Sequence, residues 1–168
     1  TTAATADVTI TGEATSDYFG IALTSGDFNA DGETDLVVGA SGYSTSAGRT
    51  YIFHNDGSIP TTAATADVTI TGEAGSGFGT SFTSGDLNTD GETDLIVGAT
   101  AYSTNTGRVY IFHNDGSIPT TAGTADVTIS GTYTSDYFGI SMTADDLNSD
   151  GKTDLAVGTN TGTHAKLY

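Results

Sequence analysis

The stretch Asp27-Phe28-Asn29-Ala30-Asp31-Gly32-Glu33-Thr34-Asp35 runs directly into the apolar segment Leu36-Val37-Val38. Acidic and amide side chains alternate ahead of a glycine, which is typical of a tight polar loop. The apolar segment after it is typical of a strand covered on both faces. The same loop and strand return at residues 86–97 and 146–157, about 60 residues apart. A repeat of this period predicts a propeller, a solenoid or another repeat array.

Each repeat carries several strand signals separated by turn residues. In the first repeat they are Phe19–Thr24, Asp35–Gly39, Arg49–Phe53 and Asp67–Thr71. Four short strands per repeat are typical of a β-propeller blade, and no segment has the period of a helix. The sequence therefore predicts an all-β fold, a β-propeller with four-stranded antiparallel blades and three blades per chain.

The repeats divide the chain into blades that start out of phase with it. We expect residues 1–168 to form a single three-blade unit, with repeats at about 15–73, 74–132 and 133–168. Residues 1–14 hold an outer-strand sequence, Asp7 to Thr11, that completes a blade. Rings have at least about four blades, so three cannot close alone. The prediction is a homodimer that exchanges strands between chain ends to give a six-bladed ring. A nine-bladed ring of three chains and a part of a longer propeller are the alternatives.

Composition limits the partners of the chain. Its 21 acidic and 4 basic residues give a formal net charge of −17, which argues against nucleic acid because phosphate binding needs clustered Lys and Arg. No apolar run is long enough for membrane insertion, and there is no cysteine to form a disulfide. Many of the acidic residues fall in the repeated loops, which indicates cation binding.

The repeated loop has the ligand chemistry of a calcium site. Calcium takes six to eight oxygen ligands, and alternate side chains in a tight loop can point inward together. The glycine permits the sharp turn, and the residue after it offers only its carbonyl, so Lys152 is tolerated there. Polar residues that simply make hairpin turns are the alternative reading. We predict three Ca²⁺ per chain, held by Asp27, Asn29, Asp31, Glu33, Asp35, Asp86, Asn88, Asp90, Glu92, Asp94, Asp146, Asn148, Asp150, Lys152 and Asp154.

Three elements in fixed order make the chain similar to a known family. A Phe-Gly pair (Phe19-Gly20 in the first repeat), the DxNxDGxxD loop and a following Leu-x-Val-Gly segment resemble FG-GAP repeats. These repeats form the seven-bladed propeller of integrin α subunits. The resemblance implies a calcium-binding β-propeller of the secreted or cell-surface kind. The segments after the second strand, such as Gly39-Ala40-Ser41, lack the proline of the family motif.

The remaining candidates are aromatic residues in loops. Tyr18, Tyr43, Tyr102 and Tyr137 could stack on a sugar, although packing between blades is the commoner role of such residues. No catalytic motif is present, so we expect no enzyme. The sequence favours a non-enzymatic binding or adhesion module with a carbohydrate or protein ligand, in one version a multivalent lectin. The alternative is a structural or designed symmetric scaffold with calcium as its only ligand.

Overall fold

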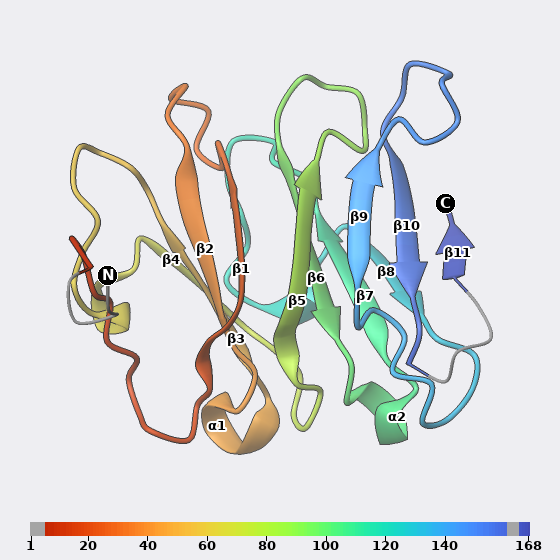
Figure 1. Ribbon diagram of the computed structural model, residues 1–168, viewed down its shortest axis with the longest axis horizontal. Coiled ribbons are helices and arrows are strands. Elements are labelled where there is room, and N and C mark those ends of the chain that lie inside the picture. The colour runs from red at the N-terminus through yellow and green to blue at the C-terminus, as the bar shows by residue number, and fades with distance from the viewer. Residues whose placement is uncertain (1–5, 161–164) are drawn as a thin grey trace.

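The computed structural model describes residues 6–160 and 165–168, which form three antiparallel sheets in sequence order (Figure 1). The first sheet contains β1 (Phe19–Gly26), β2 (Asp35–Ala40), β3 (Arg49–Phe53) and β4 (Val68–Thr71). The second contains β5 (Phe78–Gly85), β6 (Asp94–Ala99), β7 (Arg108–Phe112) and β8 (Val127–Ser130). The third contains β9 (Met142–Asp145), β10 (Asp154–Gly158) and β11 (Ala165–Leu167).

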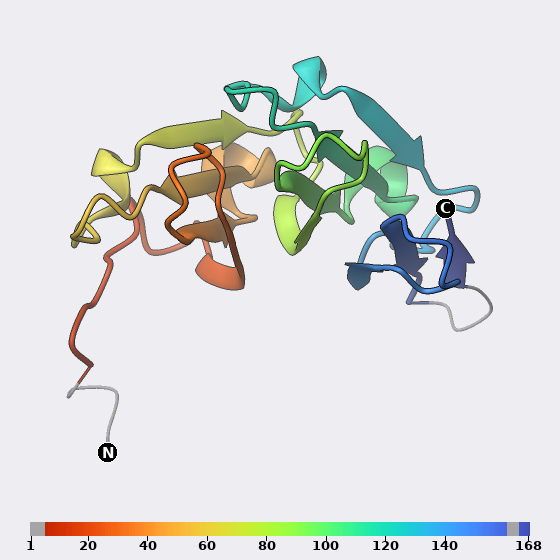
Figure 2. The ribbon, with the colours of Figure 1, turned by 90° about the horizontal axis from the view of Figure 1, so that it is seen from above.

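Each sheet is a propeller blade. Consecutive strands are hydrogen-bonded neighbours, in the orders β1-β2-β3-β4, β5-β6-β7-β8 and β9-β10-β11. Seen from above, the sheets follow an arc with β1, β5 and β9 on its concave side (Figure 2). This confirms the predicted all-β propeller architecture with three blades in one chain. The first two blades have four strands, and among the described residues the third has three.

The core lies between successive blades. One cluster joins Val37 of the first blade to Phe78 and Leu95 of the second, and another joins Ile96 of the second blade to Leu155 of the third. Burial on both faces explains why β2 and β6 are almost entirely apolar. β6 lies between two blades, whereas β2 is covered by the second blade on one face and by residues that include Ile10 and Ala63 on the other. The close approach depends on glycine: a Cβ at Gly39 would overlap the Gly79 carbonyl oxygen of the next blade.

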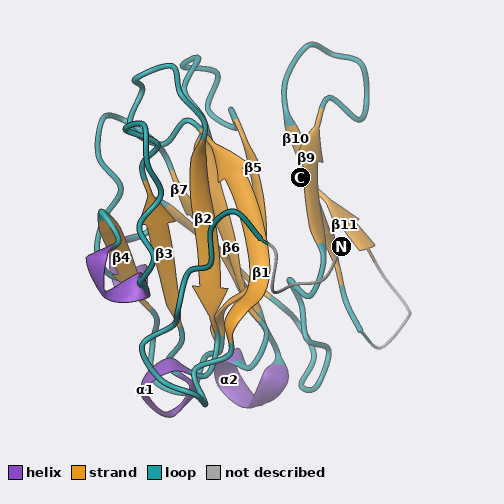
Figure 3. Cartoon of the chain, turned by 60° about the vertical axis from the view of Figure 1, so that its left-hand side comes forward, coloured by secondary structure: helices purple, strands orange, loops and turns teal. Residues whose placement is uncertain are grey.

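Two short turns at one end of the blades were not predicted from the sequence. The single-turn elements α1 (Tyr43–Ser46) and α2 (Tyr102–Asn105) connect the second and third strands of the first two blades (Figure 3). Their central residues have positive φ, for example 48° at Ser44 and 59° at Thr45, so they are left-handed turns rather than right-handed helix. Single 3-10 turns at Ala63–Thr65 and Ala122–Thr124 precede the outer strands.

The N-terminal segment makes few contacts in the single chain. Its outer strand, expected from Asp7 to Thr11, was assigned to a blade of a second chain, so the single chain does not test it; Thr11 forms a bridge to Thr62. A strand requires a continuous ladder, and among the described residues no neighbouring strand is available to this segment. The first five residues of the expected 1–14 segment, and His164 ahead of β11, lie outside the described residues.

Candidate metal and ligand sites

The three predicted metal loops lie on one end of the propeller. They connect β1 to β2, β5 to β6 and β9 to β10, opposite the end that carries α1 and α2 (Figure 1). The antiparallel pairing of the two flanking strands fixes both ends of each loop, as in the pairs Gly26 with Asp35 and Gly85 with Asp94. The predicted tyrosines of α1 and α2 therefore lie on the end away from the metal loops.

The first loop is organised by its own side chains. The Asp27 carboxylate accepts the backbone N–H groups of Asp31 at 3.2 Å and Gly32 at 2.8 Å. The Asn29 side chain donates to the Asp31 carboxylate at 2.9 Å, and that carboxylate also accepts the Glu33 N–H at 2.8 Å. These short-range bonds fold the loop back on itself. Gly32 has φ of +87°, the left-handed conformation that its position requires.

The same contacts return in the other two loops. In the second, Asp86 accepts the N–H groups of Asp90 at 3.1 Å and Gly91 at 3.0 Å. In the third, Asp146 accepts the Asp150 N–H at 3.1 Å, and Lys152 donates its backbone N–H to Asp150 at 2.9 Å. Lys152 thus joins the loop through its backbone N–H, and the calcium contact expected of its carbonyl stays a prediction. The structure brings positions one, three, five and seven of each loop together.

The aspartate at the ninth position of each loop makes different contacts from the other predicted ligands. Asp35 is buried, and its carboxylate accepts the N–H of Phe28 at 2.9 Å and of Asn55 at 2.9 Å. Asp94 is likewise buried and bonds the N–H groups of Leu87 and Asn114. These two carboxylates anchor the loop to the residue that follows the third strand. In the last blade, Asp154 accepts instead from Leu147 and Asn148.

The carboxylates at the fifth position are held in the charged form. Hydrogen bonds from the Glu33 N–H and the Asn29 side chain lower the pKa of Asp31 below its usual value. The Glu92 N–H and the Asn88 side chain lower the pKa of Asp90 in the same way. Because lowered values mean that these groups stay ionised into mild acid, they remain available to a cation there.

The donor chemistry of the loops fits calcium, since the side chains of Asp27, Asn29 and Asp31 supply oxygen atoms to one turn. In the residues that the structure describes, no three Asp, Glu, His or Cys side chains already converge as a metal cluster. The loop carboxylates are turned toward backbone N–H groups instead. Calcium binding therefore stays a prediction.

A contact between neighbouring blades was missed by the sequence reasoning. Asn114, fully buried after β7, donates its side-chain amide to the Asp27 carbonyl oxygen at 3.3 Å, across the first blade interface. Its Oδ1 atom is buried without a protein partner. Asn114 thus links the second blade to the metal loop of the first. Its recurrence as Asn55, in the same His-Asn-Asp-Gly turn, was the available signal.

A second missed element joins an acidic residue of one blade edge to the next blade. Glu73 accepts from Arg108 at 3.1 Å and from the Tyr110 hydroxyl at 2.8 Å. Glu13 makes the same two contacts with Arg49 and Tyr51, at 3.2 and 3.0 Å. We call each such group a Glu-Arg-Tyr latch. The recurring Thr-Gly-Glu and Arg-x-Tyr sequences could have indicated it, but not the pairing between them.

The latch also affects the pKa of the tyrosine that belongs to it. Burial, followed by the hydrogen bond to Glu13, raises the pKa of Tyr51, and the same causes with Glu73 raise that of Tyr110. The arginines of the two latches lie over other rings: the guanidinium carbons of Arg49 and Arg108 are 3.7 Å from the ring centroids of Tyr43 and Tyr102. One face of each of those two predicted ligand-binding rings is therefore covered by an arginine.

Tyr18 has a different environment. It is 65% exposed and lines a cleft of about 350 Å³ between the first and second blades. Ile21 and Ser46 from the first blade and Thr80 and Thr100 from the second complete much of its wall. Tyr137, the equivalent residue of the third blade, is half-buried and has positive φ, as Tyr18 does. Of the four predicted tyrosines, Tyr18 is the one that faces an open cleft.

Among the described residues, no helix combines the length and apolar character that crossing a membrane would need.

Comparisons with known proteins agree on the repeats. The model of the FG-GAP repeat matches three times, at residues 19–53, 78–112 and 138–165. Bovine phosphatidylinositol-glycan-specific phospholipase D is 36% identical over 155 residues, 83% of this chain and 18% of that protein. Human integrin alpha-X is 35% identical over 165 residues, covering 89% of this chain and 14% of its own length. Human integrin alpha-11 is 36% identical over 157 residues, 88% of this chain and 13% of its own. The chain spans less than a fifth of each of these relatives.

Proposed function

Because the chain belongs to the FG-GAP repeat family, we propose that it is a calcium-binding β-propeller module that acts by binding and not by catalysis. The observation that carries the proposal is the same backbone-to-carboxylate pattern in three loops on one end of the propeller. Each turn gathers side-chain oxygen atoms, which are the ligands that a hard cation such as Ca²⁺ takes. By analogy with integrin-type propellers, we place the module in a secreted or cell-surface protein.

Calcium would supply positive charge to loops that otherwise gather carboxylates. Asp27, Asn29, Asp31 and Asp35 would hold it in the first blade, with the carbonyl of Glu33. The equivalent residues would do so in the other blades. Each loop closes the hairpin between the first two strands of its blade, so its order supports the blade interface that Asn114 and Asp27 share. Metal binding and folding would therefore be coupled.

The cleft beside Tyr18 supports a ligand-binding role. An exposed aromatic ring beside hydroxyl side chains, such as Thr80 and Thr100, suits a carbohydrate, which offers both apolar ring faces and hydroxyl groups. Avidity, as in a multivalent lectin, would need further sites of this kind beside the Tyr18 cleft. The covered rings of Tyr43 and Tyr102 favour the second candidate, a scaffold whose only ligand is calcium.

Removal of calcium tests the first part of the proposal. Dialysis against EDTA should lower the melting temperature, and added Ca²⁺ should restore it. A single site at 100-fold excess over its dissociation constant contributes ~2.7 kcal/mol. Asp31→Ala should show a smaller calcium-dependent shift, whereas Asp56→Ala, an exposed acid outside the loops, should keep the full shift. An identical melt with and without metal in all three proteins would refute calcium coupling.

A glycan array separates the lectin from the scaffold. Binding that Tyr18→Ala abolishes and Tyr133→Ala preserves supports the lectin, since Tyr133 is similarly exposed at 62% but does not line the cleft. The absence of binding at millimolar sugar favours the scaffold.

A further inference from the structure

Among the described residues, the outer face of the third blade is an unfilled copy of an interface that occurs twice inside the chain. We propose that this face binds the first blade of a second copy of the chain, so that two copies close one six-bladed ring. Both surfaces lie within the described residues, and neither calcium nor a sugar ligand takes part in the contact.

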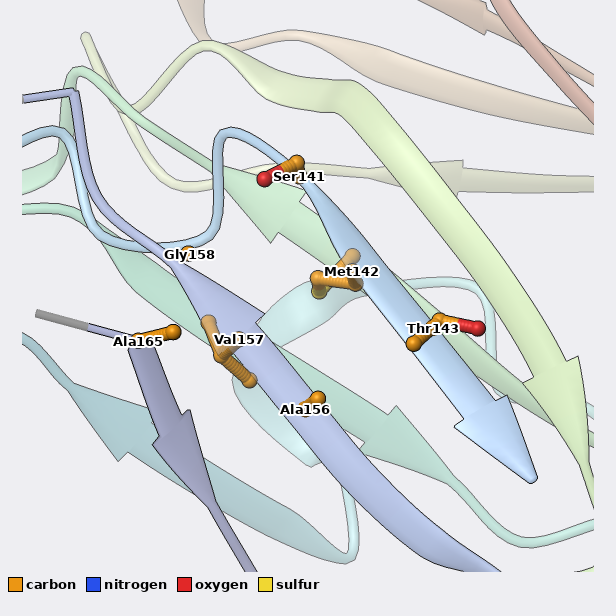
Figure 4. A pocket seen from close by; sticks show the side chains of 7 residues that line it. All are labelled: Ser141, Met142, Thr143, Ala156, Val157, Gly158 and Ala165. Carbon is orange, nitrogen blue, oxygen red and sulfur yellow. The ribbon is translucent and has the colours of Figure 1, made fainter. Parts of the chain in front are cut away.

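The receiving surface is a shallow groove on β9 and β10, lined by small and apolar residues (Figure 4). It has a volume of about 270 Å³, and Thr143, Ala156 and Gly158 contribute to its wall. In the first two blades the glycines equivalent to Gly158 lie against the neighbouring blade: a Cβ at Gly39 would meet the Gly79 carbonyl, and one at Gly98 would meet that of Gly139. At Gly158 the nearest atoms belong to Ser141 of its own blade.

The complementary surface is the exposed face of β1. Leu23 is 61% exposed, although it lies on an inner strand. Its equivalent on β5 is Phe82, which packs against the first blade beside Gly39. In the ring, Leu23 of the second copy would lie beside Gly158 as Phe82 lies beside Gly39.

The metal loops of the first and third blades also differ in how far they are covered by a following blade. Phe28 in the first loop is 2% exposed because the second blade covers it, whereas Leu147 at the equivalent position of the third loop is 48% exposed. A following blade would cover Leu147 as well. One position differs: Asp145 stands where a Cβ at Gly26 or Gly85 would meet the Cγ2 methyl group of a threonine in the next blade, so the contact would have to widen at this point of the interface with the second copy.

The N-terminal segment already lies where the outer strand of a preceding blade belongs. Thr11 bridges Thr62 in parallel, as Thr71 at the end of β4 bridges Thr121. Glu13 makes the same latch contact with Arg49 that Glu73 makes with Arg108 one blade further along the chain. The segment thus lies against the first blade, and within residues 6–160 and 165–168 it pairs with no strand as a sheet neighbour. The outer edge of β11 is the matching open edge, since among the described residues β11 pairs only with β10.

The pairing register follows from the internal blades. Ile52 lies opposite Val68, and Ile111 lies opposite Val127. By the same register, Leu167 would lie opposite Val8 of the second copy. Leu167 is 57% exposed and Val8 is 50% exposed in the single chain. Two copies give six blades, within the range of about four to eight that propellers use, whereas three copies would give nine.

Light scattering after size exclusion tests the assembly. The wild-type chain should elute with twice its 17.0 kDa mass across micromolar concentrations. Leu23→Glu should give a folded species of single-chain mass with at least a ~100-fold weaker association, since a charge would be buried without a partner. Val127→Glu, on the outer strand β8 away from both open faces, should keep the dimer. A wild-type monomer at all concentrations, or any mass other than the dimer, would overturn the proposal.

An engineered disulfide tests the register independently of mass. The chain has no cysteine, so Val8→Cys combined with Leu167→Cys introduces the only pair. Oxidation should convert the protein to a covalent dimer on a non-reducing gel. The control pair Val8→Cys with Lys166→Cys is shifted by one residue, which places the two side chains on opposite faces of the sheet, and should cross-link poorly. Equal yields of covalent dimer from the two cysteine pairs would contradict the register. If the monomeric Leu23→Glu variant still binds calcium, assembly of the ring and calcium binding are separate properties.

Discussion

At the scale of single residues, Gly39 shows how closely the blades approach. A side chain at this position would enter the backbone of the next blade at Gly79, and backbone cannot move aside as a flexible side chain can. Gly123, in a short turn ahead of β8, has open space around its α-carbon and an ordinary φ. The two glycines are therefore a matched pair that separates packing from intrinsic glycine flexibility.

We predict that Gly39→Ala destabilises the protein by about 1–3 kcal/mol through overpacking, while Gly123→Ala changes stability by less than about 0.5 kcal/mol. Urea unfolding followed by tyrosine fluorescence measures both values, since the chain lacks tryptophan. Equal costs at the two positions would mean that the blades do not pack as closely as described.

The buried phenol of Tyr110 predicts the direction in which stability changes with pH. Its pKa is raised in the folded state, by burial first and by Glu73 second. A raised value favours the protonated form, so its contribution is complete below the unfolded pKa of about 10 and is lost as pH rises above it. We expect wild-type stability to fall from pH 9 to pH 11 more steeply than that of Tyr110→Phe. Parallel pH dependences in urea unfolding would contradict this.

At the scale of elements, the acidic loop tolerates Lys152 because that residue contributes only backbone atoms to the loop. Its N–H bonds the Asp150 carboxylate, and its side chain is exposed. Asp150, by contrast, would give calcium a carboxylate. We predict that Asp150→Ala reduces the calcium stoichiometry from three to two per chain, whereas Lys152→Ala leaves it at three. Loss of a site in both variants, measured by native mass spectrometry, would show that the side chain at position seven matters.

Strands and loops were readable from the sequence because each is a local pattern. Arg49–Phe53 was predicted with the bounds that β3 has, and the loops were located by their spacing. The left-handed turn at Ser44 and Thr45 was not predicted, since polar β-branched and small residues rarely adopt positive φ and no local signal marks it. The stacking of Arg49 on Tyr43 was equally hidden, because it depends on how that turn folds back.

At the scale of the whole molecule, the blade interfaces hold the least predictable contacts. The latch between Glu13 and Arg49 joins residues 36 positions apart, and Asn114 reaches Asp27 over 87 positions. Periodicity predicts that blades exist and repeat, but the partner of each polar side chain depends on the rotation of one blade against the next. The seating of the N-terminal segment at Thr62 belongs to the same class of contact.

The central claim is that three equal loops on one end of an FG-GAP propeller each bind calcium. Isothermal titration of Ca²⁺ into the EDTA-treated full chain tests it most directly. The proposed function predicts binding of three ions per chain, one for each of the loops that begin at Asp27, Asp86 and Asp146. No saturable binding up to millimolar Ca²⁺, with the chain folded throughout, would contradict the claim and leave the carboxylates as residues that only shape the turns.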